Sequence, residues 1–265
     1  MKLLFSLCLL LSINSYCNYT ISSEINQNAV GNNFSLTTNT AWGSSSNPAC
    51  FIENRKYSGA LFYSTPFLIK DISIQAFAFN LSMNKKIQSR LALERLSYSN
   101  HSTNQLSISS GMKFNEKLKI GLLAKISYIK QVEERSILNI WPELGAIYSL
   151  NDNLILAATI KNFIPLLLKN KYNENNQTLS VGLNYQFSKK LKLNAQLIFQ
   201  NSTFPIVGVG IDYQIHSLFY TGLNFNSGNQ PIHFAIGYQM KNIQFKLGFS
   251  YHQTLGFSPS SAIYL

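Results

Sequence analysis

Residues 178–200 read TLSVGLNYQFSKKLKLNAQLIFQ, and this stretch decides the fold. Apolar side chains take every second position on both sides of the tripeptide Ser188-Lys189-Lys190, and polar side chains or glycine take most positions between them. A period of two over about ten residues on each side of a tight turn predicts an antiparallel β-hairpin with one apolar and one polar face. A soluble β-sandwich shows the same alternation, so this hairpin alone does not identify its environment.

The same alternation recurs along the chain from Tyr57 onward. Four more hairpins show it, over residues 106–128, 144–160, 207–225 and 232–251. Four further segments complete the pattern and bring the expected number of strands to about 14: residues 57–67, 72–81, 87–98 and 258–265. An even number of strands leaves both chain ends on one side of a closed barrel, as in outer-membrane proteins.

Two of these strands alternate poorly, and a proline interrupts a third. In the strands at 72–81 and 87–98, Phe77, Phe79, Arg90 and Arg95 are hard to assign to a face. Pro142 lacks the N–H that a sheet ladder needs, so it breaks the sixth strand unless a β-bulge accommodates it.

The connections and the aromatic residues favour a membrane environment. Tight turns alternate with longer connections at 131–137, 163–176 and 226–230, as short periplasmic turns alternate with longer external loops in outer-membrane barrels. Aromatic residues also recur on the apolar face just before the tight turns: Phe114, Tyr148, Tyr185, Phe187, Tyr213 and Tyr238. Aromatic residues favour strands in general, but their position near one end is typical of an interfacial girdle. The fold class predicted is therefore all-β, an antiparallel transmembrane β-barrel.

The N-terminal part of the chain lacks the alternation. Residues 1–17 combine one lysine, an apolar run and small residues near Cys17, which predicts a secretory signal peptide that is too short for a membrane anchor. Residues 18–55 are polar, small and irregular, so in a membrane protein they must lie in the barrel lumen or the periplasm. We expect this segment to form a plug or hatch, and residues 56–265 to form the barrel.

Composition excludes several function classes. The net charge is +11, but only 12% of residues are charged, and the lysines alternate with apolar residues or sit in turns instead of clustering. No nucleic-acid partner is therefore expected. Removal of the signal peptide leaves Cys50 alone, which excludes an intramolecular disulfide and a zinc site built from cysteine pairs.

Two short motifs resemble a known family. Asn47-Pro48-Ala49 and the closing stretch 250–259, SYHQTLGFSP, are similar to motifs of the Bacteroidota outer-membrane barrels related to the FadL-type long-chain fatty-acid transporter. That group includes the PorV-like proteins of type IX secretion. The resemblance implies a 14-stranded barrel with Asn-Pro-Ala-Gly after an N-terminal segment that folds inside, although here Cys50 replaces the glycine. It transfers no ligand-contacting residue.

The polar face offers candidate ligand contacts but no catalytic set. Glu94, Glu143 and Asp212 are scattered over three strands without a nucleophile and base at a recognisable spacing, so we expect no enzyme and no cofactor. His233 and His252 lie on neighbouring strands without a third ligand, so no metal is expected. The inward-facing residues expected to contact a ligand are Phe62, Lys125, Trp141, Glu143, His233 and His252.

Glycines on the polar face predict where the plug packs. Bare backbone lets strands bend as the barrel closes, or lets an internal segment approach closely. The glycines concerned are Gly121, Gly145, Gly182, Gly208, Gly210, Gly222, Gly237 and Gly248.

Two functions fit these observations, and the sequence does not separate them. The first is binding or passage of a hydrophobic small molecule, in the manner that the FadL resemblance implies. The second is a non-transporting accessory or scaffold barrel that holds a secreted or envelope protein, as the PorV resemblance implies. Both place the chain in the outer membrane, with membrane lipids around it.

Overall fold

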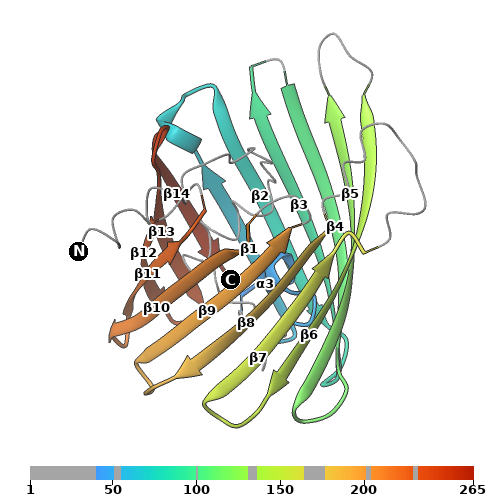
Figure 1. Ribbon diagram of the computed structural model, residues 1–265, viewed down its shortest axis with the longest axis vertical. Helices are drawn as coiled ribbons and strands as arrows, with labels where there is room; N and C mark the ends of the chain where they lie inside the picture. Colours follow the sequence, from blue (N-terminus) through green and yellow to red (C-terminus); the bar gives the residue numbers. More distant parts are fainter. Residues whose placement is uncertain are drawn as a thin grey trace.

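Fourteen antiparallel strands close into a barrel in the computed structural model, which describes residues 40–50, 55–99, 101–130, 136–163, 177–200, 204–228 and 232–265. Each strand pairs with its neighbours in sequence, and β1 pairs with β14 to close the ring (Figure 1). The expected all-β class and strand number are confirmed. The expected signal peptide, residues 1–17, lies outside the described residues, as do residues 18–39 and 51–54 of the expected plug segment.

The strands are eight to thirteen residues long. Their bounds are β1 Tyr57–Ser64, β2 Ile72–Ser82, β3 Ile87–Tyr98, β4 His101–Lys113, β5 Leu118–Lys130, β6 Ile137–Ser149, β7 Leu154–Lys161, β8 Thr178–Gln186, β9 Leu191–Gln200, β10 Ile206–His216, β11 Phe219–Asn226, β12 Ile232–Met240, β13 Ile243–His252 and β14 Gly256–Tyr264. Among the described residues, two short helical turns accompany them, α3 at Gly43–Ser46 and η1 at Pro66–Leu68.

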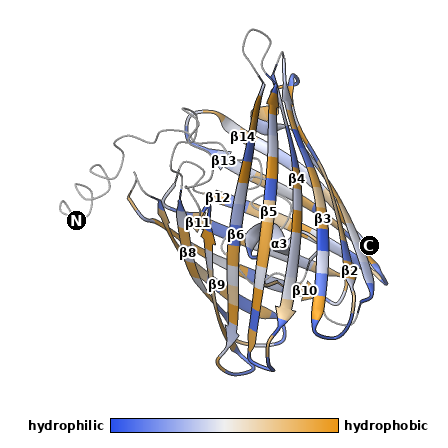
Figure 2. Cartoon of the chain, turned by 90° about the vertical axis from the view of Figure 1, so that its right-hand side faces the viewer, coloured by the Kyte–Doolittle hydropathy of each residue, from blue (hydrophilic) through white to orange (hydrophobic). Residues whose placement is uncertain are grey.

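The apolar face of the strands points outward, and the polar face points into the lumen. In β8, Leu179 and Leu183 are both 41% exposed, whereas Ser180 between them is 3% exposed. The neighbouring strand repeats this, with Leu197 exposed and Asn194 and Gln196 buried. Polar and apolar residues alternate along the strands in Figure 2. A surface of exposed apolar side chains around a closed ring is suited to hydrocarbon, because every backbone group is paired within the barrel.

Strands β2 and β3, whose alternation is poor in the sequence, alternate between outward and inward side chains in the structure. Phe77 and Phe79 point outward and Arg90 points inward, where it is 5% exposed. Arg95 points outward, between Gln75 of β2 and Asn104 of β4. This polar row follows an outward row of apolar residues that includes Phe77 and its partner Leu93. The hydrocarbon-facing surface of β2–β4 therefore ends before Arg95, and the strands continue beyond it.

Pro142 needs no β-bulge. The register between β5 and β6 runs without a shift through the pair Ala124 and Pro142. The Pro142 carbonyl accepts a hydrogen bond from Asn162 N, just past the end of β7. In a strand the N–H and C=O of one residue point toward the same neighbouring strand. The N–H that Pro142 lacks would therefore point toward the chain just beyond β7, where the pairing of β6 with β7 has ended at Glu143 and Lys161. The bulge among the described strands lies in β10, between Gln214 and His216.

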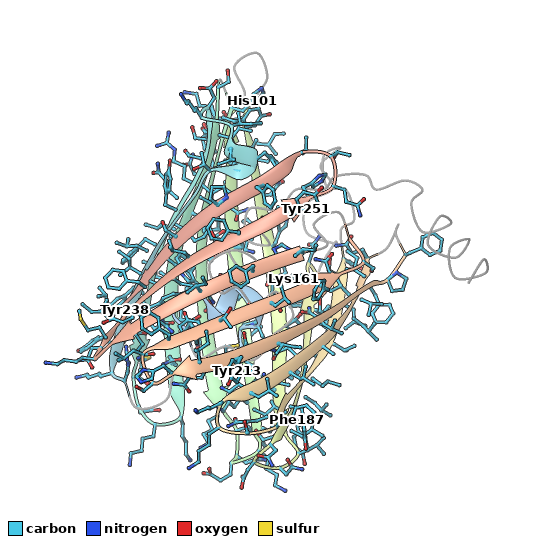
Figure 3. The ribbon with its side chains drawn as sticks, turned by 90° about the vertical axis from the view of Figure 1, so that its left-hand side faces the viewer. His101, Lys161, Phe187, Tyr213, Tyr238 and Tyr251 are labelled. Atoms are coloured by element: carbon cyan, nitrogen blue, oxygen red, sulfur yellow. The ribbon has the colours of Figure 1, made fainter. Side chains whose placement is uncertain are left out.

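The turns after even-numbered strands lie together at one end, because each strand reverses direction. Phe187, Tyr213 and Tyr238 lie toward this end on the outside of the barrel (Figure 3). The expected contrast between the two ends is only partial. At the opposite end, β3 and β4 are joined by two residues and β13 and β14 by three, as tightly as the hairpins of the short-turn end.

Candidate functional site

The described part of the N-terminal segment lies inside the barrel. Figure 1 shows α3 within the ring of strands, and Trp42, Asn47 and Ala49 have no exposed surface. The helix is a single turn of glycine and serine, closed by a bond from Asn47 N to Gly43 O. Small residues and a short turn suit a segment that must fit between the walls of a barrel. Residues 40–50 of the expected plug segment therefore lie inside the barrel.

Asn47 ties this segment to the barrel wall. Its side-chain amide donates to the carbonyls of Ala146 and Ala158, over 3.2 and 3.4 Å, and these two residues are cross-strand partners in β6 and β7. Its side-chain oxygen accepts from Ala49 N at 2.9 Å, which tightens the turn through Pro48. One asparagine therefore fixes both the shape of the Asn-Pro-Ala motif and its position on the wall.

Two glycines make room for the motif. A Cβ on Gly121 of β5 would lie 2.2 Å from the Pro48 carbonyl oxygen, and a Cβ on Gly145 of β6 would lie 2.0 Å from the Asn47 side-chain oxygen. The wall here is only one backbone thick. On its outer side is an apolar hollow of about 490 Å³, lined by residues that include Leu122, Leu144 and Ile160. This hollow faces away from the lumen.

Basic side chains bind backbone carbonyls of the plug. The Arg90 guanidinium donates to the Cys50 carbonyl and, over 3.1 Å, to the Gln88 side chain. The Lys161 ammonium donates to the Ser45 carbonyl over 3.4 Å. Backbone carbonyls at the end of a short helical turn lack partners within the turn, so cations stabilise them well.

Next to these anchors is a buried group of charges. Lys125 of β5 and Glu143 of β6 form a salt bridge of 3.1 Å, with side chains only 2% and 3% exposed. Glu94 of β3 is 3% exposed, and neither of its carboxylate oxygens accepts a hydrogen bond from a described residue. Charges buried in this way are stable only when opposite charges or polar groups surround them. This sector of the lumen is therefore polar and densely charged.

A neighbouring sector of the lumen is apolar. Trp42 of the plug packs in a cluster with Phe62 of β1, Ile74 of β2 and Tyr264 of β14, and partly buried Leu96 of β3 packs against the cluster. Four alanines of β1–β3 and one of β14 complete its walls. The Trp42 indole N–H is buried without a hydrogen-bond partner among the described residues. The plug thus presents a large aromatic ring to an apolar surface that gives its N–H no acceptor.

The structure brings four of the six predicted ligand contacts to the walls that border the plug. Phe62 lies in the apolar cluster, whereas Lys125 and Glu143 form the buried pair, and Trp141 is the cross-strand partner of Lys125. The two histidines lie on β12 and β13, with different surroundings. His233 is buried 3.4 Å from the Asn226 amide, and His252 accepts from the backbone of the β13–β14 turn and contacts the Phe67 ring.

Sequence reasoning missed several residues that shape this site. Arg90 belongs to a strand that alternates poorly in the sequence, and Trp42 belongs to a segment without alternation. Tyr220 was also overlooked: its ring fills the space beside Gly237, with the Lys246 ammonium 5.5 Å from the ring centre. The alternation of faces could have placed Arg90 and Tyr220 in the lumen. No signal in the sequence shows which wall Trp42 contacts.

The residues that the structure describes contain neither a membrane-spanning helix nor a metal-binding cluster. None of their helices is long and apolar enough to cross a membrane. Within the same residues, no three His, Cys, Asp or Glu side chains are grouped so that they could hold a metal ion.

The chain resembles solved structures but matches no family model and no curated protein. Two crystal structures of the toluene transporter TodX of Pseudomonas putida align with TM-scores of 0.60 and 0.59. In both, the identity is 10%, and the alignment covers 82% of this chain and 90% of the TodX chain. A deltaS2S3 mutant of TodX, a monoaromatic hydrocarbon channel, aligns with a TM-score of 0.54 at 11% identity over 78% of this chain and 88% of the mutant. At such identities, the similarity shows that the barrel fold is shared.

Proposed function

We propose that this chain is an outer-membrane barrel that binds a hydrophobic small molecule in the apolar sector of its lumen, between Trp42 and the wall formed by β1–β3 and β14. The observation that carries the proposal is the buried apolar cluster itself. Lumen-facing positions of outer-membrane barrels are usually polar. Here Phe62 and Ile74 instead form a buried apolar cluster with Trp42 of the plug, and Leu96 packs against this cluster.

The end of the barrel opposite the short-turn end supports an entry route for an apolar ligand into this sector. Beyond the hydrocarbon-facing surface, the outward positions of β2–β4 become polar, at Gln75, Arg95 and Asn104. The inward positions of β2 and β3 at this level stay apolar, with Ile74 paired to Leu96. An apolar molecule arriving from water would therefore bind more favourably to the inner surface at this end of the barrel than to its outer surface.

Passage through the barrel requires the plug to move, and its contacts indicate how. The plug is fastened at Asn47 and Cys50, on the β3–β7 side. Trp42 is held by apolar packing alone, and an indole N–H buried without an acceptor costs about 1–3 kcal/mol. A ligand that replaced the Trp42 ring and let its N–H reach water would recover this cost. We infer that Trp42 is the part of the plug that a ligand displaces.

The second function, an accessory barrel that holds another protein, is favoured by the anchoring of the plug. The Asn-Pro-Ala motif is bonded to backbone carbonyls and seated against two glycines, which is a firm attachment for a gate. An accessory barrel of this kind needs no ligand in the apolar sector. The two functions therefore differ in whether Trp42 responds to a hydrophobic molecule.

The chain has only two tryptophans, Trp42 and Trp141, which makes a direct test possible. In the variant Trp141→Phe all tryptophan fluorescence comes from Trp42, and in Trp42→Phe it comes from Trp141. The purified full chain is titrated with 1-bromododecane, because a bromine atom quenches an indole that it contacts. We expect saturable quenching of Trp42 and little quenching of Trp141, which lies opposite Lys125.

The matched pair of variants also controls for the detergent. Bromododecane that only dissolves in the micelle would quench both fluorophores equally and without saturation. That result would contradict ligand binding beside Trp42 and favour the accessory function.

A further inference from the structure

The tertiary structure gathers lysines that the sequence spreads out. Hairpin turns after β2, β4, β8 and β12 all lie at the short-turn end, and each carries exposed basic side chains. These residues are Lys85, Lys86, Lys117, Lys189, Lys190 and Lys241. The acids in the described turns at this end are Glu116 and Asp152, and Glu116 is paired with Lys113. Lysines that do not cluster in the sequence thus form a basic rim, defined here as these six residues.

The turns do not need these lysines for their shape. In the β2–β3 turn the Asn84 side chain accepts from the backbone N–H groups of Lys86 and Ile87, and Asn115 does the same in the β4–β5 turn. Asn151 makes the same two bonds in the β6–β7 turn, which contains no lysine. The lysine side chains are therefore free to serve another purpose.

The β12–β13 turn strengthens this point. Lys241 has a φ of 47°, in the left-handed region where asparagine or glycine is less strained. A basic side chain stands there despite its conformational cost.

Exposed aromatic residues accompany the rim, as expected for residues at the depth of a lipid headgroup layer. Aromatic residues form the outer surface just before these turns, with Phe114 65% and Phe187 58% exposed. At the start of β1, the Lys56 ammonium sits 5.3 Å from the centre of the Tyr57 ring, which is itself outward and exposed. Aromatic rings of this kind mark the membrane interface, and lysines beside them extend their ammonium groups toward the phosphates. In Figure 3, nitrogen-tipped side chains project along the lower rim.

We propose that this basic rim binds the phosphodiester headgroups of anionic phospholipids in the leaflet at the short-turn end of the barrel. The basic turns lie on several sides of the ring and not in a single patch, as the strand order shows. Lipids surround a barrel in this way, whereas one protein partner would contact one side. The proposal is independent of any ligand in the lumen.

Native mass spectrometry of the purified full chain tests it. The protein is equilibrated in detergent with equal amounts of phosphatidylglycerol and phosphatidylcholine, and the retained lipids are counted. One lysine at an anionic surface contributes about a fivefold preference, so we expect at least that preference for phosphatidylglycerol. Raising the salt to about 0.5 M should weaken it, because screening shortens the range of the attraction.

Two triple variants with the same net charge make the test specific. Lys86→Gln, Lys117→Gln and Lys190→Gln change the rim, and Lys70→Gln, Arg95→Gln and Lys130→Gln change the opposite end, so each set lowers the charge from +11 to +8 (11 − 3 = 8). The first set should reduce the phosphatidylglycerol preference at least about threefold, and the second should leave it unchanged. A gel shift on heating shows that both variants are folded.

Three results would overturn the proposal. The first is a wild-type protein without a phosphatidylglycerol preference, and the second is an equal loss in both triple variants. The third is binding of soluble polyglutamate through the rim lysines with no lipid preference, which would assign the rim to an acidic protein.

Discussion

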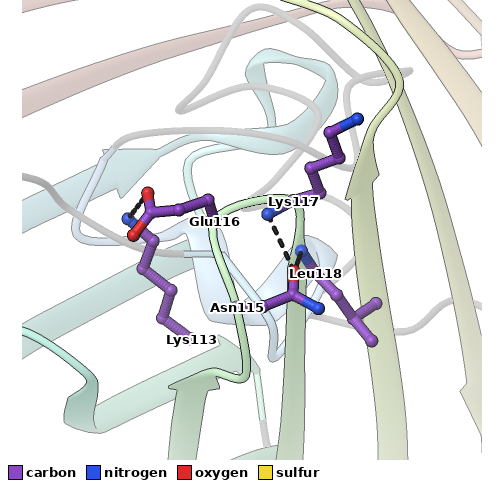
Figure 4. A network of polar contacts seen from close by, with 5 residues as sticks. All are labelled: Lys113, Asn115, Glu116, Lys117 and Leu118. Carbon is purple, nitrogen blue, oxygen red and sulfur yellow. Dashed lines mark hydrogen bonds and ion pairs between the residues drawn. The ribbon is translucent and has the colours of Figure 1, made fainter.

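Two Lys–Glu pairs, one in the lumen wall and one at the β4–β5 turn, have almost the same distance between their charged atoms but very different surroundings. Lys125 and Glu143 are separated by 3.1 Å, and Lys113 and Glu116 by 2.9 Å. The first pair is almost completely buried, whereas the Glu116 side chain is 91% exposed. Figure 4 shows the second pair at the β4–β5 turn, beside the Asn115 side chain that shapes the turn.

The difference shows that the distance between two charged atoms does not measure how much an ion pair contributes to the stability of the fold. At the rim, water screens both charges, so the pair stabilises the fold little. In the lumen wall, each charge has lost its water, and removal of one partner leaves the other buried without the ion pair that offsets its desolvation. The buried pair is therefore a requirement for the fold of the lumen, and the exposed pair is a local feature of one turn.

The largest expected effect is that of Lys125→Met. It should lower the free energy of unfolding by about 3–5 kcal/mol, because Glu143 would remain buried without its partner. Urea titration monitored by the gel shift on heating measures this. The double variant Lys125→Met with Glu143→Leu should recover most of the loss, since it buries no charge at either position. If Lys113→Met destabilised the barrel as much as Lys125→Met, the contrast between the two pairs would be wrong.

A smaller effect is expected from the glycines that make the lumen tight. Gly121→Ala places a Cβ against the Pro48 backbone, which is bonded in place, so we expect a loss of about 1–3 kcal/mol. Gly237→Ala is the matched control, because its Cβ meets the end of the flexible Tyr220 ring, which can rotate away. The same urea titration compares the two variants. A larger loss of unfolding free energy for Gly237→Ala than for Gly121→Ala would contradict this, because it would mean that the plug backbone adjusts to a new Cβ more easily than the Tyr220 ring does.

The smallest effect is expected at the rim. The hydrogen bond from Lys113 lowers the pKa of the Glu116 carboxyl below its usual 4.5. A carboxyl with a lowered pKa in the folded state stabilises the protein above its unfolded pKa, and this contribution disappears as the pH falls through the folded pKa. Glu116→Gln should therefore lower the thermal midpoint slightly at pH 7, and this difference, measured by circular dichroism, should disappear as the pH falls through the folded pKa of Glu116. A pH-independent difference would show that Glu116 acts through something other than its charge.

The sequence by itself determined the hairpins, the faces of most strands and the number of strands. These features follow from a period of two, which depends only on neighbouring residues and on whether each face meets hydrocarbon or the lumen. Glycine at inward positions of β5 and β6 also predicted that an internal segment could approach the wall. The structure seats Asn47 and Pro48 against Gly121 and Gly145.

Only the tertiary structure decided which distant residues meet. Closure of the ring places Trp42 against β1–β3 and β14, pairs Lys125 with Glu143, and separates the surroundings of His233 and His252. It also collects the lysines of four hairpin turns at one end of the barrel into one basic rim. These contacts between distant residues depend on the tilt of the strands, the stagger of their register and the path of the plug. Such quantities depend on the whole closed barrel, so no local pattern in the chain encodes them.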